Sequence, residues 1–330
     1  MSLAGRQVLV TGATGFLGGA LALRLAQDGV QVKALARRPQ KARYISGQPN
    51  ITIIEGDITD LERMKQVMQG CSIVFHVAAA LGGTLEKQHH INVDGTRNVM
   101  LAAAEARVER VVVVSSIAVY GYGYNGDITE DFEQKPLRTP YNITKSQAEA
   151  VVREIGAQTN LAYSIVRPAM IYGPRSNAWT ATLFKLAKSN PTPFLGDGHG
   201  NVHPIYVDDV VDLMTQLAMH PAAVGQAFNC SADPAPTWRE FLGGYSRLVG
   251  HNRWLSIPPI IMRPIAPLIE FFLALRGEPQ ELPTLVDFLQ ASKTYKMTKA
   301  RGLLGWQPKT DLQTGINNCA PWLREKGLLN

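Results

Sequence analysis

The sequence predicts an α/β protein with a doubly wound parallel sheet and a smaller C-terminal lobe. Three observations predict this fold class. Short apolar runs recur along the first half of the chain without polar alternation, which is typical of strands buried on both faces. Segments with helical periodicity separate these runs, and glycines mark several of the junctions. A regular alternation of strand and helix implies parallel pairing with right-handed crossovers.

The elements follow one another in a regular order. We expect strands at residues 6–11, 30–37, 50–57, 72–78 and 110–116, and helices at 16–29, 60–70, 91–106 and 140–157. After residue 170 prolines become more frequent and apolar runs shorten. The sequence therefore predicts a first domain at residues 1–171 and a smaller lobe at 172–330. One strand–helix unit at about 203–221 resembles the earlier ones, so we expect it to return to the first domain.

The composition restricts the class of protein. The chain has 330 residues, of which 45% are hydrophobic, enough for a full core. Its formal net charge of +6 is spread along the chain without a Lys/Arg block, which argues against nucleic-acid binding. The cysteines Cys71, Cys230 and Cys319 are too few and too far apart for a disulfide framework or a zinc site, and we expect no metal. These features favour a cytoplasmic protein.

Two segments bear on membrane association. The N-terminal MSLAGRQVLVTG lacks a basic region followed by an apolar run, so we expect no signal peptide. The most lipophilic stretch, residues 257–275, contains Arg263, Glu270 and four prolines, which argue against a transmembrane span. This stretch is open to three interpretations: a lid over a binding site, a peripheral contact with a membrane surface, or core of the lobe.

The first predicted strand leads into a glycine-rich turn, TGATGFLG at residues 11–18. Gly12 permits a tight turn, Gly15 lets the backbone approach a pyrophosphate, and Gly18 lets helix and strand pack closely. The free N–H groups at the start of the helix would then bind the phosphates. Tight turns also use glycine, but the strand before and the helix after favour a dinucleotide site. Its expected contacts are Gly12, Thr14, Gly15, Phe16, Leu17 and Gly18.

The ends of the second and third predicted strands bear on which dinucleotide binds. Arg37 and Arg38 occupy the place where an NAD site usually has an acidic residue, so they can pair with the 2′-phosphate of NADP. We therefore expect NADP, with NAD as the alternative if both arginines are solvated turn residues. Asp57 can bind the adenine amino group with Ile58 packing on the ring, or Asp57 can cap the next helix.

Eight motifs in a fixed order give the chain a family resemblance. They are TGATGFLGG, GDITD, VFHVAA, NVDGTRNV, VSSIAVYG, YNITK, VRPAMIYGP and GDGHGNVHPIYVDDVV. In this order and spacing the chain resembles the extended short-chain dehydrogenase/reductase family over nearly its whole length. It looks most like the branch of 3β-hydroxysteroid dehydrogenases and dihydroflavonol reductases. The resemblance implies a Rossmann-type domain, a nicotinamide cofactor and a catalytic set of Ser, Tyr and Lys.

The motifs of the family assign residues of this chain. Tyr141 and Lys145 fill the YxxxK pattern, and Ser116 matches the serine, with Ser115 as the alternative. In the stretch TPYNITK a threonine cap and a proline precede them, so both side chains share one helical face. We expect the Lys145 ammonium to lower the pKa of Tyr141, which then transfers a proton. Asn92 matches a cofactor-site asparagine, although a plain helix cap also explains it. The other implied cofactor contacts are Ala78, Ala79, Ala80, Ser115, Pro168 and Ile171.

The sequence restricts the substrate only in class. Family members that bind nucleotide sugars often have Asn and Arg where this chain has Met170 and Val202, and their loss removes partners for a diphosphate. Arg175 or His203 can take over that role. We therefore expect hydride transfer between the nicotinamide and a secondary alcohol or ketone of a steroid-like or other apolar small molecule. The expected substrate contacts are Ser116, Tyr172 and His203.

Two other functions stay open. A nucleotide-sugar epimerase or dehydratase of the same family would cycle through a keto intermediate without net redox change. A non-catalytic NAD(P) sensor would need the cofactor site but no proton relay. The complete set of Ser116, Tyr141 and Lys145 argues against the sensor.

A homodimer is the expected assembly. The helices at 91–106 and 140–157 would lie side by side on one face of the sheet, and in the family such helices often pair across a two-fold axis. In the alternative interpretation the same residues face the sheet of their own subunit and the protein is a monomer. The residues expected on the dimer surface are Val93, Val99, Met100, Ala103, Ala104, Ala148, Val151 and Val152.

Overall fold

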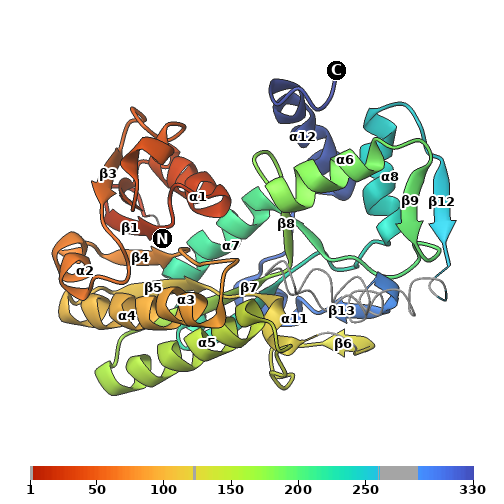
Figure 1. Ribbon diagram of the computed structural model, residues 1–330. Coiled ribbons are helices and arrows are strands. Elements are labelled where there is room, and N and C mark those ends of the chain that lie inside the picture. The colour runs from red at the N-terminus through yellow and green to blue at the C-terminus, as the bar shows by residue number, and fades with distance from the viewer. Residues whose placement is uncertain (1–2, 122–123, 259, 261–288) are drawn as a thin grey trace.

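The main sheet of the protein is parallel throughout. The computed structural model describes residues 3–121, 124–258, 260 and 289–330 (Figure 1). Within these residues seven strands pair in the order β11-β7-β5-β4-β1-β2-β3. They are β1 (Gln7–Thr11), β2 (Gln31–Ala36), β3 (Ile51–Glu55), β4 (Ile73–His76), β5 (Arg110–Val114), β7 (Tyr163–Pro168) and β11 (Gln226–Cys230). The predicted α/β fold class with a Rossmann-like parallel sheet is confirmed.

Alternate side chains of the central strand are buried on opposite faces of the sheet. Val8 and Val10 belong to a core shared with α1 (Phe16–Gln27) and α7 (Val207–Met219). Leu9, between them, belongs to a second core on the other face. All three side chains are fully buried, as a sheet covered on both faces requires. This burial explains why the strands read as continuous apolar runs.

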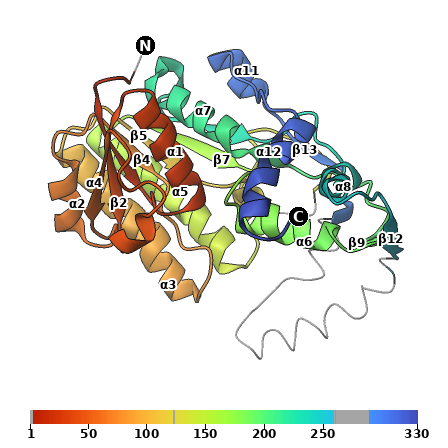
Figure 2. The same ribbon diagram turned by 90° about the horizontal axis from the view of Figure 1, so that it is seen from above.

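Three helices cover the second face of the sheet (Figures 1 and 2). They are α2 (Leu61–Met68), α4 (Gly95–Glu105) and α5 (Pro140–Thr159). Polar side chains cap the N-termini of two of these helices. Asp60 accepts a hydrogen bond from the backbone N–H of Arg63 at 2.9 Å, and Thr139 caps α5 just before a first-turn proline. The short helix α3 (Leu85–His89) lies beside α5.

The second lobe packs three helices around an aromatic core. The helices are α6 (Leu183–Ala187), α8 (Trp238–Leu248) and α12 (Leu312–Glu325). Phe241 contacts Tyr172 and Tyr245 with ring centroids 5.3 and 5.5 Å apart, and all three rings are almost fully buried. Parallel strand pairs complete the lobe: β8 (Met170–Tyr172) with β10 (Pro204–Tyr206), β9 (Thr192–Leu195) with β12 (Trp254–Ile257), and β6 (Gly126–Ile128) with β13 (Lys293–Tyr295).

In the part of the chain that the structure describes, short turns and one further helix connect these elements. The helix is α11 (Thr298–Leu304). The 3₁₀ or π-helical turns are Pro39–Ala42, His90–Asp94, Ile117–Tyr120, Asn177–Thr182 and Pro221–Ala223. The turn at His90–Asp94 means that the helix expected at 91–106 begins as π-helix and becomes regular only at Gly95.

The chain returns to the main sheet after it has entered the second lobe. Helix α7 packs against α1, β5 and β7. Strand β11 then pairs with β7, with Gln226 opposite Ser164 and Cys230 opposite Pro168. Strand β11 was not predicted from the sequence, because QAFNC is short and mixed in polarity. We keep the division between residues 171 and 172 as a proposal, with α7 and β11 as later elements that join the first part.

The surface expected to form a dimer is internal to one subunit. Helices α4 and α5 pack against each other and against the sheet. Seven of the eight residues are at most 6% exposed, and Ala104 is partly buried against the same core. Their assignment to an intermolecular surface was therefore wrong. Their small side chains instead permit the close approach of two helices within one chain.

The described residues contain no helix that is both long and apolar enough to cross a membrane. Of the apolar stretch at 257–275, only residues 257, 258 and 260 are described. Its three interpretations, as lid, membrane contact or lobe core, therefore concern residues outside the described part of the chain.

Candidate active site

The glycine-rich turn leaves the start of α1 open to an anion. Gly12 has a φ of +69°, and a Cβ there would lie 2.8 Å from the backbone nitrogen of Ala78. A Cβ on Gly18 would collide with the carbonyl oxygen of Gly12. Gly15 precedes α1 as its N-cap and has no side chain to occupy the first N–H groups. The turn therefore fits a dinucleotide, because it combines close packing with free N–H groups for a pyrophosphate.

The other residues expected at this turn divide into two groups. Thr14 and Phe16 are partly exposed beside the free N–H groups. The Leu17 side chain is 7% exposed and belongs to the core under the sheet. Leu17 can therefore meet a cofactor only through its backbone.

A buried polar relay beneath the turn was missed by the sequence analysis. The Thr11 hydroxyl oxygen accepts hydrogen bonds from the backbone N–H groups of Val77 and Ala78, each at 3.1 Å. The ring of His76 joins Thr11 to Thr96, with 2.9 Å on each side. Burial lowers the pKa of His76 to about 3, so this ring is neutral. The relay ties β1, β4 and α4 together directly under the segment that follows β4.

Tyr44 contacts the glycine-rich turn and is itself contacted by Arg175 from the second lobe. The Tyr44 hydroxyl donates to the carbonyl oxygens of Ala13 at 3.1 Å and Gly15 at 2.5 Å. The guanidinium carbon of Arg175, which follows β8, lies 3.4 Å from the centroid of the Tyr44 ring. This is a cation–π geometry. The two lobes therefore touch at the turn where the dinucleotide is expected.

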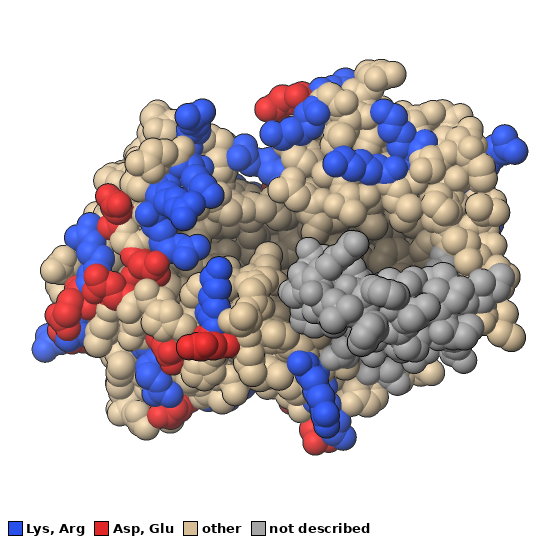
Figure 3. Space-filling view, in the orientation of Figure 1, with Lys and Arg blue, Asp and Glu red and all other residues tan. Residues whose placement is uncertain are grey.

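The two arginines expected to select the cofactor lie at the exposed end of β2. The Nη1 atom of Arg37 is 3.9 Å from Oδ2 of Asp57, and the two side chains are 64% and 37% exposed. A pair this open is weak, so Arg37 remains available to another anion. Arg38 is exposed and precedes the turn at residues 39–42. Figure 3 shows basic side chains over the N-terminal elements, beside a hollow between the two lobes.

The end of β3 supports only part of the expected adenine site. The Oδ1 atom of Asp57 accepts from the backbone N–H of Thr59 at 3.1 Å, which makes a local turn, while Asp60 caps α2. Ile58 is 4% exposed, and a Cβ on Gly95 would lie 2.7 Å from its terminal carbon. Ile58 thus packs under α4, and its side chain has no free face for an adenine ring.

Asn92 fixes the segment that follows β4. Its Oδ1 accepts from the backbone N–H of Ala80 at 2.7 Å, and its Nδ2 donates to the Ala80 carbonyl at 3.0 Å. The same Nδ2 donates to the Thr144 hydroxyl of α5 at 3.0 Å. Ala78 and Ala79 are partly exposed in this segment. The amide of Asn92 is therefore occupied by the protein, and it acts by holding the segment beside α5.

The three expected catalytic residues meet at the carboxyl end of β5. The Ser116 side chain lies close enough to the Tyr141 phenol to lower its pKa. The Nζ atom of Lys145 donates to the carbonyl of Val114 at 2.9 Å and lies 6.0 Å from the centroid of the Tyr141 ring. Ser115 is 4% exposed and lines an inner cavity with Lys145. The geometry therefore favours Ser116 over Ser115 as the partner of the phenol.

The electrostatics of this set differ from the expectation. Burial raises the pKa of Tyr141, and the nearby Ser116 hydroxyl offsets part of the rise. Burial lowers the pKa of Lys145 to about 8, while the charge of Glu149 raises it. Lys145 is not among the groups that shift the Tyr141 pKa in this geometry, in which its ammonium is directed to the carbonyl of Val114. The phenol is thus held in its neutral form, which can donate a proton to a substrate oxygen.

The residues expected near the nicotinamide follow β7. Pro168 ends β7 opposite Cys230, and Ile171 lies half-buried on β8. Tyr172 is 2% exposed and contacts Tyr206 and Phe241, and a Cβ on Gly315 would collide with its hydroxyl. This places Tyr172 in the packing of the second lobe and corrects its assignment as a substrate contact.

His203 is also enclosed by the second lobe. Its side chain has no exposed surface, and its ring lies 4.7 Å from that of Tyr295, edge to face. Burial lowers its pKa to about 3, so the imidazole is neutral. His203 therefore lies in the interior of the second lobe. Its backbone carbonyl accepts a hydrogen bond from the backbone N–H of Met170 at 3.0 Å.

Comparisons with known proteins agree with this geometry. The sequence profile of the NAD dependent epimerase/dehydratase family matches residues 8–231. The chain is 30% identical over 312 residues to 3beta-hydroxysteroid-dehydrogenase/decarboxylase isoform 2 of Arabidopsis thaliana, covering 88% of this chain and 53% of that protein. It thus spans about half the length of that relative. It is 30% identical over 334 residues to Sterol demethylase protein B of Methylococcus capsulatus, covering 97% of this chain and 99% of that one.

A solved structure supports the same assignment. MoeE5 in complex with UDP-glucose and NAD is 26% identical and aligns with a TM-score of 0.77, covering 98% of this chain and 99% of that one. The fold, the glycine-rich turn and the profile match over residues 8–231 lead to one conclusion. The chain belongs to the NAD dependent epimerase/dehydratase family.

Proposed function

We propose that the protein is an NAD(P)-dependent oxidoreductase that transfers hydride between the nicotinamide and a secondary alcohol or ketone. One observation carries this proposal: Ser116, Tyr141 and Lys145 meet at the carboxyl end of β5. The glycine-rich turn lies at the same edge of the sheet, where α/β proteins bind their ligands. A protein that only sensed the cofactor would have no use for a phenol, a hydroxyl and an ammonium at one place.

Each residue has a distinct task in the proposed reaction. When bound, the nicotinamide supplies or accepts the hydride. For reduction of a ketone, the Tyr141 hydroxyl gives its proton to the carbonyl oxygen, and Ser116 orients the same oxygen through a hydrogen bond. The Lys145 ammonium turns from the Val114 carbonyl toward the phenolate that remains and stabilises it. For oxidation of an alcohol, the phenolate takes the proton back.

We propose NADP as the preferred cofactor. The support is the exposed end of β2, where the carboxylate partner of Arg37 among the described residues is distant and solvent-exposed. The guanidinium can therefore turn to a 2′-phosphate and give up only a weak ion pair with Asp57. The NAD in the related MoeE5 structure supports a nicotinamide dinucleotide without deciding between the two.

We propose a steroid-like or other apolar substrate. Met170 and Val202, which replace the polar residues of nucleotide-sugar enzymes, are 4% and 0% exposed. Neither position can offer a hydrogen bond to a diphosphate. The names of the Arabidopsis and Methylococcus relatives, both sterol enzymes, support this class.

A nucleotide-sugar epimerase or dehydratase is the second candidate. The similarity to MoeE5, whose structure contains UDP-glucose, favours it. In that reaction Tyr141 would remove and return a proton while the nicotinamide takes and returns the hydride within one turnover, so the cofactor would end in its starting state. The two candidates differ in whether the amount of reduced nicotinamide changes during the reaction.

A substrate panel separates the candidates. Purified protein is incubated with 3β-hydroxysteroids or UDP-sugars and NADP or NAD, or with aryl ketones and NADPH or NADH. The absorbance of reduced nicotinamide is followed. A steady absorbance change with a steroid or ketone supports the proposal. Conversion of a UDP-sugar, seen by chromatography without an absorbance change, assigns the second candidate. No conversion with any class contradicts both.

We also propose a cytoplasmic homodimer. Cys71, Cys230 and Cys319 are buried and not joined by a disulfide, which suits a reducing compartment. Because the α4–α5 contact is internal, a dimer would use the outward side of these helices, where Leu101 is 37% exposed. Light scattering decides the assembly: a concentration-independent mass near 36.1 kDa contradicts the dimer.

A further inference from the structure

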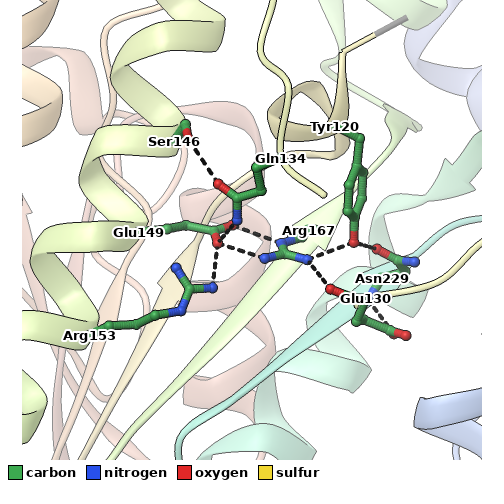
Figure 4. A network of polar contacts seen from close by, with 8 residues as sticks. All are labelled: Tyr120, Glu130, Gln134, Ser146, Glu149, Arg153, Arg167 and Asn229. Carbon is green, nitrogen blue, oxygen red and sulfur yellow. Dashed lines mark hydrogen bonds and ion pairs between the residues drawn. The ribbon is translucent and has the colours of Figure 1, made fainter. Parts of the chain in front are cut away.

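A buried ion pair lies one helical turn beyond Lys145 (Figure 4). The Oε1 atom of Glu149 accepts from Nε of Arg167 at 2.9 Å, and its Oε2 accepts from Nη2 at 2.8 Å. The two side chains are 1% and 3% exposed. Gln134 and Arg153 donate further hydrogen bonds to Oε2 at 2.8 and 2.7 Å. The carboxylate is therefore bidentate with Arg167 and fully satisfied.

Arg167 also reaches the turn that carries Ser116. Its Nη1 atom donates to the Tyr120 hydroxyl at 2.6 Å and to the carbonyl of Glu130 at 3.1 Å. Tyr120 in turn donates to Oδ1 of Asn229 at 2.7 Å. Tyr120 ends the 3₁₀ turn that Ser116 caps. Arg167 on β7 thus connects α5, with Tyr141 and Lys145, to the element with Ser116.

The groups that face Lys145 make Glu149 its anionic neighbour. From α5 these groups are Tyr141 and Glu149, from β4 the neutral ring of His76, and from β5 the Val114 carbonyl. Glu149 and Lys145 line the same small inner cavity. An ammonium buried without an anion would favour its neutral form. The carboxylate therefore supplies the field that a charged lysine needs here.

We propose that Glu149, held bidentately by Arg167, is a positioning residue that keeps the Lys145 ammonium charged and in place for the reaction. The proposal rests on the function proposed above, in which Lys145 acts as a cation beside Tyr141. It assigns a task to a buried ion pair on the face of α5 that also carries Tyr141 and Lys145.

The role of Arg167 follows from the carboxylate. Burial alone would raise the pKa of Glu149, but the hydrogen bonds and charge of Arg167 lower it to about 2. Glu149 therefore stays ionised at any working pH. Without Arg167 a buried carboxyl group would take up a proton near neutral pH, and Lys145 would lose its anionic neighbour.

The test measures the charge of Lys145 directly in the cofactor-free protein. The protein is labelled with ¹³C at the lysine Cε atoms, and the Lys145 signal is identified by its loss in Lys145→Met. The wild-type signal should titrate near the expected pKa of about 8. In Glu149→Gln the midpoint should move to lower pH, by roughly tenfold or more in proton concentration.

Two further variants keep the test decisive. Glu149→Gln leaves Arg167 buried without its partner, so Glu149→Gln/Arg167→Met removes both charges and carries the test if the single variant does not fold. Its Lys145 midpoint should also be lowered. The control is Glu154→Gln on the same helix, whose carboxylate pairs with Arg97 at the surface, and it should leave the midpoint unchanged.

An unchanged Lys145 midpoint in the folded Glu149 variants overturns the proposal. The titration needs no substrate or turnover, so it can fail while the proposed oxidoreductase activity stands. Conversely, if the protein proves to have no oxidoreductase activity, the Lys145 titration is still expected to respond to the Glu149 variants. The two failures are therefore distinguishable.

Discussion

The ammonium nitrogen of Lys145 lies 6.0 Å from the centroid of the Tyr141 ring, one turn along the same helix. It donates to the carbonyl of Val114, while the Tyr141 phenol lies beside the Ser116 hydroxyl. The two side chains therefore belong to one site without a direct hydrogen bond between them in the described geometry. This relationship fixes what a substitution of either residue should do.

Tyr141→Phe should reduce turnover by about 10²–10⁴-fold, because it removes the proton donor. Cofactor affinity should stay nearly unchanged, since the ring and its packing remain. The measurement is the rate of absorbance change with the best substrate of the panel, together with a cofactor titration. Tyr163→Phe is the matched control and should keep full activity. Tyr163 begins β7, at the edge of the sheet opposite to the one where the site lies. Near-full activity in Tyr141→Phe would remove this residue from the mechanism.

Gly18→Ala should abolish cofactor binding and lower stability. The added Cβ meets the carbonyl of Gly12, so α1 must move away from the turn. Isothermal titration with NADP and NAD measures the binding. Gly302→Ala, in α11 with nothing within 4 Å of its Cβ, should bind normally and gain up to about 1 kcal/mol of stability. Normal binding by Gly18→Ala would show that the helix can shift without harm.

Arg37→Ala should weaken NADP binding by about ten- to a hundredfold, which corresponds to roughly 1.5–3 kcal/mol for a charge-assisted contact. NAD binding should not change, since NAD lacks the 2′-phosphate. Parallel titrations of the apo protein measure both affinities. Arg43→Ala, exposed in the same region, serves as the control. If NADP and NAD bind with equal affinity and Arg37→Ala changes neither affinity, this arginine faces solvent and does not contact the cofactor.

The Glu149–Arg167 pair should make stability fall in acid. The pKa of Glu149 is lowered from 4.5 to about 2 in the folded protein. Its ionisation therefore stabilises the fold above about pH 4.5, and this contribution is lost as the pH falls toward 2. Urea unfolding across this range measures the loss. Glu149→Gln/Arg167→Met should lack it, whereas Arg167→Met alone should lose about 3–5 kcal/mol at neutral pH. A double variant with the wild-type acid profile would contradict this assignment.

The sequence was sufficient where the requirement is local. Gly12 and Gly18 are needed by one turn, and the pattern around them identifies it. Tyr141 and Lys145 are one turn apart, so their shared face follows from spacing alone. The same spacing could have identified Glu149, four residues after Lys145, as a member of that face.

The sequence was insufficient where partners meet only through the fold. Thr11 and His76 are 65 residues apart, and no local pattern joins them. The pKa of Tyr141 depends on how the lobe and helix enclose the phenol, which spacing does not reveal. Tyr172 was expected at the substrate for its position in a motif, but packing against Phe241 directs it into the core.

The late arrival of β11 has a consequence for synthesis of the protein. Strand β7 ends at Pro168, but its outer partner is complete only when Cys230 has left the ribosome. Until then the nascent chain exposes an unpaired, apolar edge strand, a template for association with other chains. Chains that terminate prematurely between these two residues should therefore aggregate or be captured by chaperones, while those that extend past Cys230 can close the sheet.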